Sequence, residues 1–334
     1  MGPLKLRFAS RRYDRTLPVL NGTLGIEGVE LRADEWESVP GLFSAVFRGE
    51  YDVAEMSLAE LVHYTSHGTA EFVGIPVFPS RIFRHGFIFC RAGAAIDGPA
   101  SLSGKRLGFP RLVQTACIWI HGLLVDEYGL SPKDTPLFVG GTHHWDEGDG
   151  ERTFKTPDGS TVHQLPRVTP DENENLERAL LDGTIDALGT TRVPRPLLAG
   201  ERTVHRLFAD PPADEATYFR KTGIFPIMHV LVVRKDVVAR RPELPVELFD
   251  LFSRAKRAGA EWLDMDPSIS LAWKNRYLAQ ERAFFGGDPW VYGLGPNEHN
   301  VRKFIGYCGA LGITARPLEP RELFHPSTWT LEER

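Results

Sequence analysis

Apolar and polar residues in the first eighty positions follow two periods in turn, which predicts strands separated by helices. A period of two residues is typical of a half-buried strand, and a period of 3.6 residues is typical of an amphipathic helix. The strand-like runs are 4–9, 28–33, 51–56 and 72–77, and the helical runs are 17–20, 40–48 and 58–64. Short links between such elements favour a parallel sheet wound by right-handed crossovers. The sequence therefore predicts an α/β fold.

The pattern after residue 86 predicts a second lobe inserted into the first. The apolar run 227–233 is expected to return to the first lobe and to pair with 87–91 as a two-stranded hinge. Further strands are expected at 102–109 and 184–192, helices at 114–128, 174–182, 245–262, 270–285 and 301–311, and a loop or loose hairpin at 140–161. We expect lobe 1 to comprise residues 1–90 and 228–334, and lobe 2 to comprise residues 91–227.

Composition and charge narrow the class of protein. The chain has 334 residues, 42% of them hydrophobic, which is enough for two lobes. A net charge of -5 without a basic tract argues against nucleic acid as a partner. Cys90, Cys117 and Cys308 lie in apolar runs without a CxxC spacing, which favours core packing in a reducing compartment. We expect neither a signal peptide nor a membrane span, and we expect the cytoplasm as the location.

The stretch 76–90, PVFPSRIFRHGFIFC, concentrates candidate chemistry between two apolar runs. It carries Ser80, Arg81, Arg84 and His85 among three phenylalanines. Two arginines and a histidine are costly to bury there without an anionic partner or a chemical task. We interpret the stretch as one wall of a site for a small aromatic acid. The alternative is a surface turn whose arginines pair with acidic residues of the chain.

Polar residues also follow other predicted strands, at the corners where open α/β sheets bind ligands. Tyr13, Asp14 and Arg15 follow the first strand, and Arg192 ends the run 184–192. These side chains are predicted to face a cleft. Alternatively, Asp14 caps the next helix and Arg15 is solvated.

The third predicted strand ends in Glu55, Met56 and Ser57. Ser57 with Glu60 three residues later matches a capping box, so a structural explanation is available for Ser57. No such explanation is available for Glu55. His143, His144 and Asp146 lack the spacing of a metal site and are expected in an exposed loop.

Six phrases of the chain resemble, as a set, the 4,5-dihydroxyphthalate decarboxylases. They are YDRT (13–16), DVAEMSL (52–58), IPVFPSRIFRH (75–85), LSGKRLGFP (102–110), RKTGIFPIMH (220–229) and WVYGLGPN (290–297), and they span roughly 290 residues in the expected order. The chain departs from the family pattern at 111–113, before Gln114 and Thr115, and at 190–196, around Arg192. LSGKRLGFP alone is only a general solute-binding signature.

The resemblance implies a two-lobed type II periplasmic-binding-protein-like fold, with two strands crossing the hinge, and a cofactor-free aromatic decarboxylase. The implied partner is a small aromatic carboxylate. His85 or His229 would donate a proton to the ring carbon, and Glu55, Asp14 or Tyr13 would polarise the phenol. Arginines would clamp the remaining carboxylate. The expected substrate-binding residues are Tyr13, Arg15, Ser57, Ser80, Arg81, Arg84, Gln114, Thr115, Arg192, Phe225, Trp290 and Tyr292.

Two other functions stay open. The fold alone also suits a solute-binding protein that closes on an aromatic acid without chemistry. A metal-dependent lyase using His85, His229 and Glu55 is a third and weaker hypothesis. We expect no metal, although the sequence leaves metal dependence open. The sequence leaves open the ring substituents of the substrate, the order of proton transfers and the oligomeric state, including a homo-oligomer.

Overall fold

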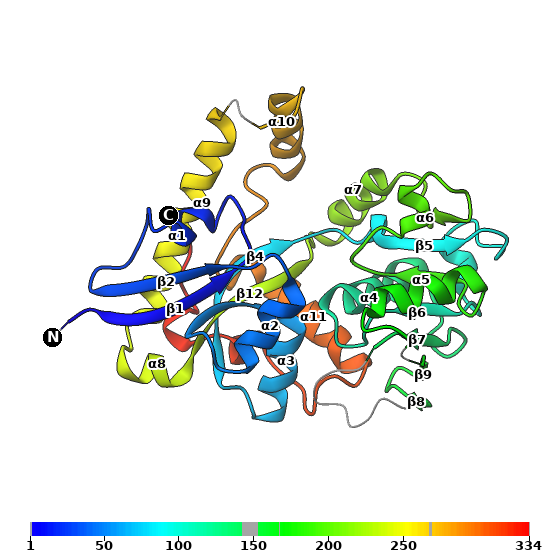
Figure 1. Cartoon of the computed structure of the whole chain (residues 1–334), viewed down its shortest axis with the longest axis horizontal. Coiled ribbons are helices and arrows are strands. Elements are labelled where there is room, and N and C mark those ends of the chain that lie inside the picture. Colours follow the sequence, from blue (N-terminus) through cyan, green and yellow to red (C-terminus); the bar gives the residue numbers. More distant parts are fainter. Residues whose placement is uncertain (1, 142–152, 167, 267–268, 334) are drawn as a thin grey trace. The chain divides into compact units, whose positions relative to one another are not determined.

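The computed structural model describes residues 2–141, 153–166, 168–266 and 269–333, and the chain divides into two compact units (Figure 1). Unit 1 comprises Met1–Arg81, Ile227–Arg302 and Leu318–Arg334. Unit 2 comprises Ile82–Pro226 and Lys303–Pro317. Residues 303–317 thus group with unit 2, whereas the sequence analysis assigned them to lobe 1. The reason is local packing, because Phe304 and Tyr307 lie against the ring of Trp119.

Unit 1 is built on a five-stranded sheet in the order β2-β1-β3-β12-β4. Its strands are β1 (Leu4–Ser10), β2 (Val29–Glu35), β3 (Val53–Ser57), β4 (Phe72–Arg81) and β12 (Ile227–Arg234). β1 runs parallel to β2 and β3, and β12 runs antiparallel to β3 and β4. The first residues of β12 therefore lie at the same edge as the last residues of β3 and β4.

The predicted pairing of 227–233 with 87–91 is wrong. β12 lies between β3 and β4, and its Leu231 is paired with Glu55 on one side and Ile75 on the other. A run that is apolar on both faces is typical of a strand buried within a sheet, which explains the central place of β12. The chain does pass between the units next to paired residues, Arg81 at the end of β4 and Ile227 at the start of β12.

Helices cover both faces of the sheet of unit 1. They are α1 (Leu17–Leu20), α2 (Val39–Phe47), α3 (Leu58–His67), α8 (Lys235–Arg240), α9 (Leu244–Met265) and the first residues of α11 (Glu298–Ala310). α10 (Lys274–Phe285) has no buried residue and does not cover the sheet. Right-handed crossovers place α1 and α2 on opposite faces, and Figure 1 shows α2 and α3 on the same side. α9 packs beside α1, and its Phe252 meets Phe8 of β1 edge to face, with ring centroids 5.4 Å apart. Ser57 begins α3, but its side chain makes no capping hydrogen bond, so the predicted capping box is wrong.

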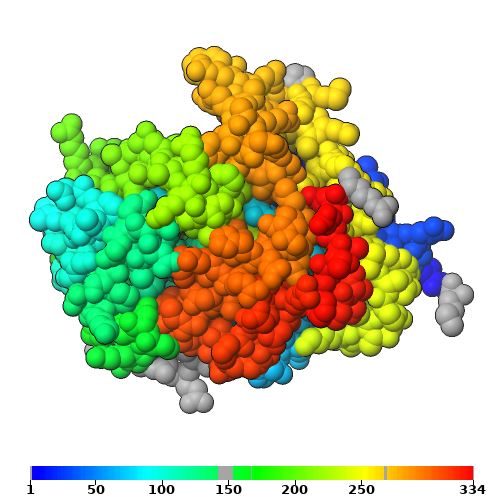
Figure 2. Space-filling view, turned by 180° about the vertical axis from the view of Figure 1, so that it is seen from behind, coloured from blue at the N-terminus to red at the C-terminus, as the bar shows by residue number. Residues whose placement is uncertain are grey.

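The C-terminal segment of unit 1 lies along β4 and α9. It contains the 3-10 turns η4 (Pro320–Leu323) and η5 (Pro326–Thr328). A Cβ atom on Gly74 of β4 would lie only 2.7 Å from the carbonyl oxygen of Leu323, so this close approach requires glycine. Figure 2 shows the segment in red beside the yellow and orange residues of unit 1.

Unit 2 is built on a seven-stranded mixed sheet in the order β11-β5-β10-β6-β7-β9-β8. Its strands are β5 (Ile88–Arg91), β6 (Leu107–Phe109), β7 (Leu137–Val139), β8 (Thr153–Lys155), β9 (Thr161–Gln164), β10 (Ala187–Gly189) and β11 (Val204–Arg206). Its helices are η1 (His85–Phe87), η2 (Pro99–Leu102), α4 (Thr115–Tyr128), α5 (Glu172–Asp182), α6 (Arg195–Leu198) and α7 (Pro211–Thr222). Phe89, Leu176 and Leu188 lie in one buried cluster that joins α5 to the sheet.

β8 and β9 pair as an antiparallel hairpin over 153–164, which begins inside the range expected as a loop or loose hairpin, 140–161, and extends three residues beyond it. His143, His144 and Asp146 lie outside the described residues. Within the described ranges, no helix has both the length and the apolar character needed to cross a membrane.

Candidate functional site

Strand ends of unit 1 bring several predicted site residues to one edge of the sheet. β1 ends at Ser10, β3 at Ser57 and β4 at Arg81, and the antiparallel β12 begins there. His229 of β12 is paired with Ser57 on one side and with Ser80 on the other. The carboxyl ends of strands in an open α/β sheet are the usual place for a ligand. This edge is the candidate site of unit 1.

Glu55 is the centre of the candidate site. Its Oε1 accepts hydrogen bonds from the Tyr13 hydroxyl at 2.8 Å and from His229 Nδ1 at 2.5 Å. Its Oε2 accepts from the Ser10 hydroxyl at 2.9 Å and from the backbone N–H of Arg11 at 2.8 Å. Glu55 and His229 lie diagonally across the β3–β12 ladder, on the same face of the sheet. All four contacts suit an ionised carboxylate, which accepts hydrogen bonds and donates none.

The hydrogen bonds decide the charge of Glu55. Complete burial by itself raises the pKa of this carboxyl, but the hydrogen bond and charge of His229 and the donors at Arg11 and Tyr13 lower it below its ordinary value. Burial and the neighbouring Glu55 raise the pKa of the Tyr13 hydroxyl. The cluster therefore holds a carboxylate and a protonated phenol at neutral pH.

His229 has one nitrogen fixed and one not engaged. Its Nδ1 donates to Glu55, and its Nε2 makes no hydrogen bond to any residue in the described part of the chain. Phe43 of α2 meets the imidazole edge to face, with ring centroids 5.2 Å apart. The His229 side chain is 15% exposed, so the imidazole is fixed in orientation but remains partly accessible to solvent. A carboxylate on Nδ1 fixes the tautomer and the ring orientation of a histidine.

Arg15 lies between two aromatic rings. Its guanidinium carbon is 3.7 Å from the ring centroid of Trp290 and 4.6 Å from that of Tyr13. Nε donates to the carbonyl of Pro79 at 2.7 Å and Nη1 to Asp14 at 2.8 Å. Nη2 has no partner within the described part of the chain. The predicted capping role of Asp14 is not seen, because α1 begins after Thr16 and Asp14 binds Arg15 instead.

Arg81 has a different environment from Arg15. It is buried, and its Nη2 donates to the carbonyl of Val291 at 2.9 Å and to Asn297 Oδ1 at 2.5 Å. Burial lowers the pKa of Arg81 to about 10. These contacts attach the end of β4 to residues 290–297, which favours a structural role over the predicted clamp.

The segment with Trp290 and Tyr292 is held in place from α9. Lys256 donates to the carboxylates of Asp288 and Glu333 and, at 2.9 Å, to the carbonyl of Trp290. Tyr292 is fully buried, and its hydroxyl has no hydrogen-bond partner among the described residues. Trp290 therefore covers Arg15, whereas Tyr292 is part of the core.

His85 belongs to unit 2 and lies in an aromatic environment. Its ring is 5.0 Å from that of Phe208, 5.3 Å from Tyr218 and 5.9 Å from Tyr128, measured between centroids. The side chain is fully buried, and neither ring nitrogen has a hydrogen-bond partner within the described residues. Burial lowers the pKa of His85 to about 4, so the imidazole is neutral at pH 7. This favours a core histidine over the predicted proton donor.

Most of the other predicted residues of unit 2 lie at the start of α4 or close to the ends of the segment 82–226. Gln114 is the N-cap residue of α4 and accepts a hydrogen bond from Cys117 Sγ at 3.0 Å, and Thr115 is the first helical residue. Arg84 is buried against Phe87, and burial lowers its pKa to about 10. Phe225 stacks on Phe83 at 4.8 Å. Arg84, Gln114 and Thr115 thus supply a cation and a helix N-terminus within unit 2, and Cys117 of α4 is close enough to Arg84 to affect its pKa.

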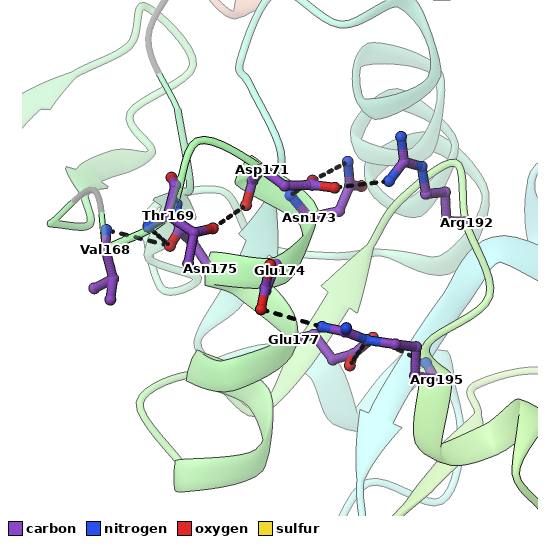
Figure 3. Close-up of polar contacts among 9 residues, drawn as sticks. All are labelled: Val168, Thr169, Asp171, Asn173, Glu174, Asn175, Glu177, Arg192 and Arg195. Carbon is purple, nitrogen blue, oxygen red and sulfur yellow. Dashed lines mark hydrogen bonds and ion pairs between the residues drawn. The ribbon is translucent and has the colours of Figure 1, made fainter. Parts of the chain in front are cut away.

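Arg192 is exposed and forms an ion pair. Figure 3 shows its guanidinium bound to Asp171, with Nη1 2.9 Å from the carboxylate. Asp171 also caps α5 by accepting from the backbone N–H of Asn173, and Arg195 binds Glu177 in the same view. The contacts join α5 to the loop after β10, so the bonding seen for Arg192 is that of a surface pair.

Several contacts of the site were not predicted from the sequence. They involve Ser10, Phe43, Asn297 and Gly259, the last of which lies on α9 against the backbone of Asp14. The position of Ser10 at the end of a strand next to β3 was a usable signal. The others depend on tertiary packing. No group of three or more His, Cys, Asp or Glu side chains in the described ranges is arranged to hold a metal ion.

Two α/β units, with candidate ligand-binding residues at the strand ends, identify the fold of this protein as a type II periplasmic-binding-protein-like fold. The chain is similar to the aliphatic sulphonate binding protein SsuA of Escherichia coli, with a TM-score of 0.56 and 11% identity over 99% of this chain and 100% of that one. It is also similar to the alkanesulfonate-binding protein SsuA of Xanthomonas axonopodis pv. citri, with a TM-score of 0.54 and 15% identity over 97% and 99% of the two chains. At these identities the likeness concerns the fold alone.

Two curated relatives define the family. A 4,5-dihydroxyphthalate decarboxylase of Comamonas testosteroni is 34% identical over 98% of this chain and 98% of that protein. Another from Pseudomonas putida is 32% identical over 66% of this chain and 83% of that protein. No family model matches the sequence. The chain belongs to the 4,5-dihydroxyphthalate decarboxylase family.

Proposed function

We propose that the protein is a carboxy-lyase that converts a hydroxylated aromatic dicarboxylic acid such as 4,5-dihydroxyphthalate to protocatechuate and carbon dioxide, without a cofactor. Membership of the family supports the reaction class. The observation that carries the proposal is the Glu55–His229 pair, which leaves Nε2 of an oriented imidazole available at the strand ends. Such a reaction would be a step in the catabolism of phthalate-type acids.

The chemistry needs little beyond placed protons. Each carboxylate of 4,5-dihydroxyphthalate is para to a hydroxyl, so withdrawing the phenolic proton directs electron density onto the carbon that bears the carboxylate. Protonation of that carbon gives a dienone-like intermediate. Breaking the bond to the carboxylate returns the electron pair to the ring and releases carbon dioxide. Reprotonation of the phenolate completes the reaction, which consumes one proton overall.

His229 is the proposed proton donor to the ring carbon. Its Nε2 carries the proton, and the Glu55 carboxylate on Nδ1 stabilises the imidazolium that this requires. A placed general acid typically contributes about 10²- to 10⁴-fold to the rate. Glu55 is saturated with four donors and fully buried, so it acts as a positioning residue rather than on the substrate.

Tyr13 is the proposed partner of the phenol. Its hydroxyl donates to Glu55, so its oxygen can accept a hydrogen bond from the substrate hydroxyl while Glu55 strengthens it as an acceptor. Ser57 and Ser80, on the strands beside His229, are the proposed neighbouring hydrogen-bonding groups. Asp14 is bound to Arg15, so its proposed role is to orient that arginine.

Arg15 is the proposed clamp for the carboxylate that stays on the ring. A planar guanidinium can bind a carboxylate through two parallel hydrogen bonds, and Trp290 and Tyr13 fix the plane of this one. Arg84, Gln114 and Thr115 of unit 2 are kept as separate candidates, because a helix N-terminus favours an anion. Equal binding of both carboxylates would not raise the rate, so the departing one is expected to lack a cationic clamp.

We also propose that the protein acts in the cytoplasm. Cys90, Cys117 and Cys308 are all buried free thiols, which suits a reducing compartment. Immunodetection in fractionated cells of the source organism would test this, and recovery from the periplasm would contradict it.

The function is tested by turnover in heavy water. The purified protein is expected to release carbon dioxide and protocatechuate in equal amounts, with one deuterium on the carbon that lost the carboxylate. No turnover of this acid or of a panel of hydroxylated benzoates would remove the proposal. Tight binding of the acid without product would instead indicate a solute-binding protein.

A further inference from the structure

A buried lysine on α9 holds the segment 288–293 of unit 1. The side chain of Lys256 is only 10% exposed. Its ammonium donates hydrogen bonds to the carboxylates of Asp288 and Glu333 and to the carbonyl of Trp290. An ammonium at such a site has lost most of its water, so it needs anionic partners to stay charged there. The proposed reaction uses none of these three charges.

The two acidic partners of Lys256 are not equivalent. The side chain of Asp288 is 49% exposed, whereas that of Glu333 is 15% exposed. Solvent screens an exposed carboxylate, so Glu333 compensates the ammonium more strongly. Glu333 Oε2 also accepts a hydrogen bond from the backbone N–H of Tyr292 at 2.9 Å. One carboxylate of the C-terminal segment, drawn in red in Figure 2, therefore binds both α9 and the segment 288–293.

These contacts fix Trp290 at both of its backbone groups. The N–H of Trp290 donates to Asp288 Oδ1 at 2.8 Å, and its carbonyl accepts from Lys256 Nζ at 2.9 Å. The ring of Trp290 lies 3.7 Å from the guanidinium carbon of Arg15, measured from the ring centroid. A ring in this position attracts the guanidinium and restricts its plane. One chain of direct contacts therefore runs from Glu333 to the proposed carboxylate clamp.

The proposed proton donor is held by other contacts. Glu55 and His229 lie on β3 and β12, and Glu55 also accepts hydrogen bonds from β1 and the loop after it. The sheet thus sets the position of the imidazole, whereas the position of Arg15 also depends on the ring of Trp290. Loss of the contacts of the buried lysine should therefore weaken the binding of the carboxylate and change the proton transfer little.

We propose that Lys256 and Glu333 are positioning residues for Arg15, and that this buried pair sets the affinity of the protein for aromatic carboxylates. The inference rests on the proposed function, because it takes Arg15 as the clamp. Both members of the pair act through Trp290 and not on the substrate. A residue of the C-terminal segment thereby controls the corner 13–15 at the other end of the sequence.

Isothermal titration calorimetry with phthalate tests the pair separately from the reaction. Phthalate has two adjacent carboxylates but no phenol, so it cannot react by the proposed route. Glu333→Gln and Lys256→Met are each expected to raise the Kd by about tenfold, which is the effect of one charge-assisted hydrogen bond. Glu332→Gln, at the exposed neighbour of Glu333, is the matched control and should bind phthalate as the wild type does.

A double-mutant cycle with Trp290→Ala tests how the pair acts. If the pair acts through this ring, Glu333→Gln should change the Kd by less than about twofold in the Trp290→Ala protein. A merely structural role would lower the melting temperature of Glu333→Gln and leave the Kd of the folded protein unchanged. With 4,5-dihydroxyphthalate as the substrate, Glu333→Gln should raise KM by about tenfold and keep kcat within about threefold of the wild type.

Three results would overturn the proposal. The first is wild-type Kd in the folded Glu333→Gln and Lys256→Met proteins. The second is an undiminished effect of Glu333→Gln in the Trp290→Ala protein. The third is a wild type that binds neither phthalate nor 4,5-dihydroxyphthalate, which would also remove the clamp. If the wild type binds phthalate but releases no carbon dioxide from 4,5-dihydroxyphthalate, only the proposed reaction is lost, and the expected changes in Kd still support the pair.

Discussion

Gly259 on α9 is expected to control the position of Arg15, and Gly259→Ala tests this. A Cβ atom at Gly259 would lie 2.4 Å from the carbonyl oxygen of Asp14 and 3.0 Å from the backbone nitrogen of Arg15. Ordinary contact begins at 3.4 Å, so the backbone between Tyr13 and Arg15 must move by about 1 Å. A misplacement of 1 Å in a positioned group can cost about 10²-fold in rate. We therefore expect kcat/KM to fall by about 10²-fold.

The same substitution should change stability much less than activity. Alanine favours an α-helix over glycine by about 1 kcal/mol, and overpacking a buried site costs about 1–3 kcal/mol. The two effects oppose each other, so urea unfolding should show a net loss of at most about 2 kcal/mol.

Gly306→Ala on α11 is the matched control for Gly259→Ala. No atom lies within 4 Å of the added Cβ at Gly306, so this variant should gain about 0.5–1 kcal/mol and keep its activity. Wild-type kcat/KM in a folded Gly259→Ala protein would refute the role assigned to the Tyr13–Arg15 corner.

Three further predictions concern single side chains. Arg15→Lys should raise KM, because a point charge replaces a planar guanidinium. Arg81→Lys should lower the free energy of unfolding by about 1–3 kcal/mol, because the hydrogen bonds to Val291 and Asn297 are lost, and should leave KM near the wild-type value. A stability loss in Arg15→Lys and a raised KM in Arg81→Lys would reverse the two roles. Glu55→Gln should cost about 1–3 kcal/mol of unfolding free energy at pH 7, since an amide cannot accept from all four donors. The pKa of Glu55 is lowered in the fold, so this difference should shrink as the pH falls below about 4, and a difference independent of pH would contradict an ionised Glu55. The pKa of His85 is about 4 in the folded protein and about 6.5 in the unfolded chain, so its contribution to the free energy of unfolding is present above pH 6.5 and is lost as the pH falls toward 4. Urea unfolding should therefore show a loss of about 2 kcal/mol between pH 7 and pH 5. His85→Phe should remove that loss. An unchanged pH dependence in His85→Phe would show that His85 is not a buried neutral group.

The order of strands and helices could be predicted because burial leaves a period in the sequence. β1 and α2, for example, lie within one or two residues of the expected ranges. β4 was predicted to end at residue 77, because Pro79 usually marks the end of a strand. β4 instead continues to Arg81. Its pairing with β12 is irregular on both sides of His229, so Pro79, which has no N–H group, need not take part in a regular ladder. The pairing of β12 was missed because apolar runs do not identify their neighbours.

The candidate site could be predicted as a set of residue types, but not as a set of roles. His85 and His229 both flank apolar runs in the sequence, and only burial separates them. His85 lies among aromatic rings without a polar partner, whereas His229 lies across a ladder from Glu55. Arg15 and Arg81 were likewise equivalent as charges. Tertiary contacts commit Arg81 to the segment 290–297 and place Arg15 between two rings.

The most direct test compares the two histidines as matched variants. His229→Asn and His85→Asn are assayed for release of protocatechuate from 4,5-dihydroxyphthalate, with folding checked by circular dichroism. We expect His229→Asn to lower kcat by about 10²- to 10⁴-fold and folded His85→Asn to keep kcat within about threefold of the wild type. A His229→Asn enzyme with wild-type kcat, or a folded His85→Asn enzyme without activity, would contradict the assignment of the proton donor.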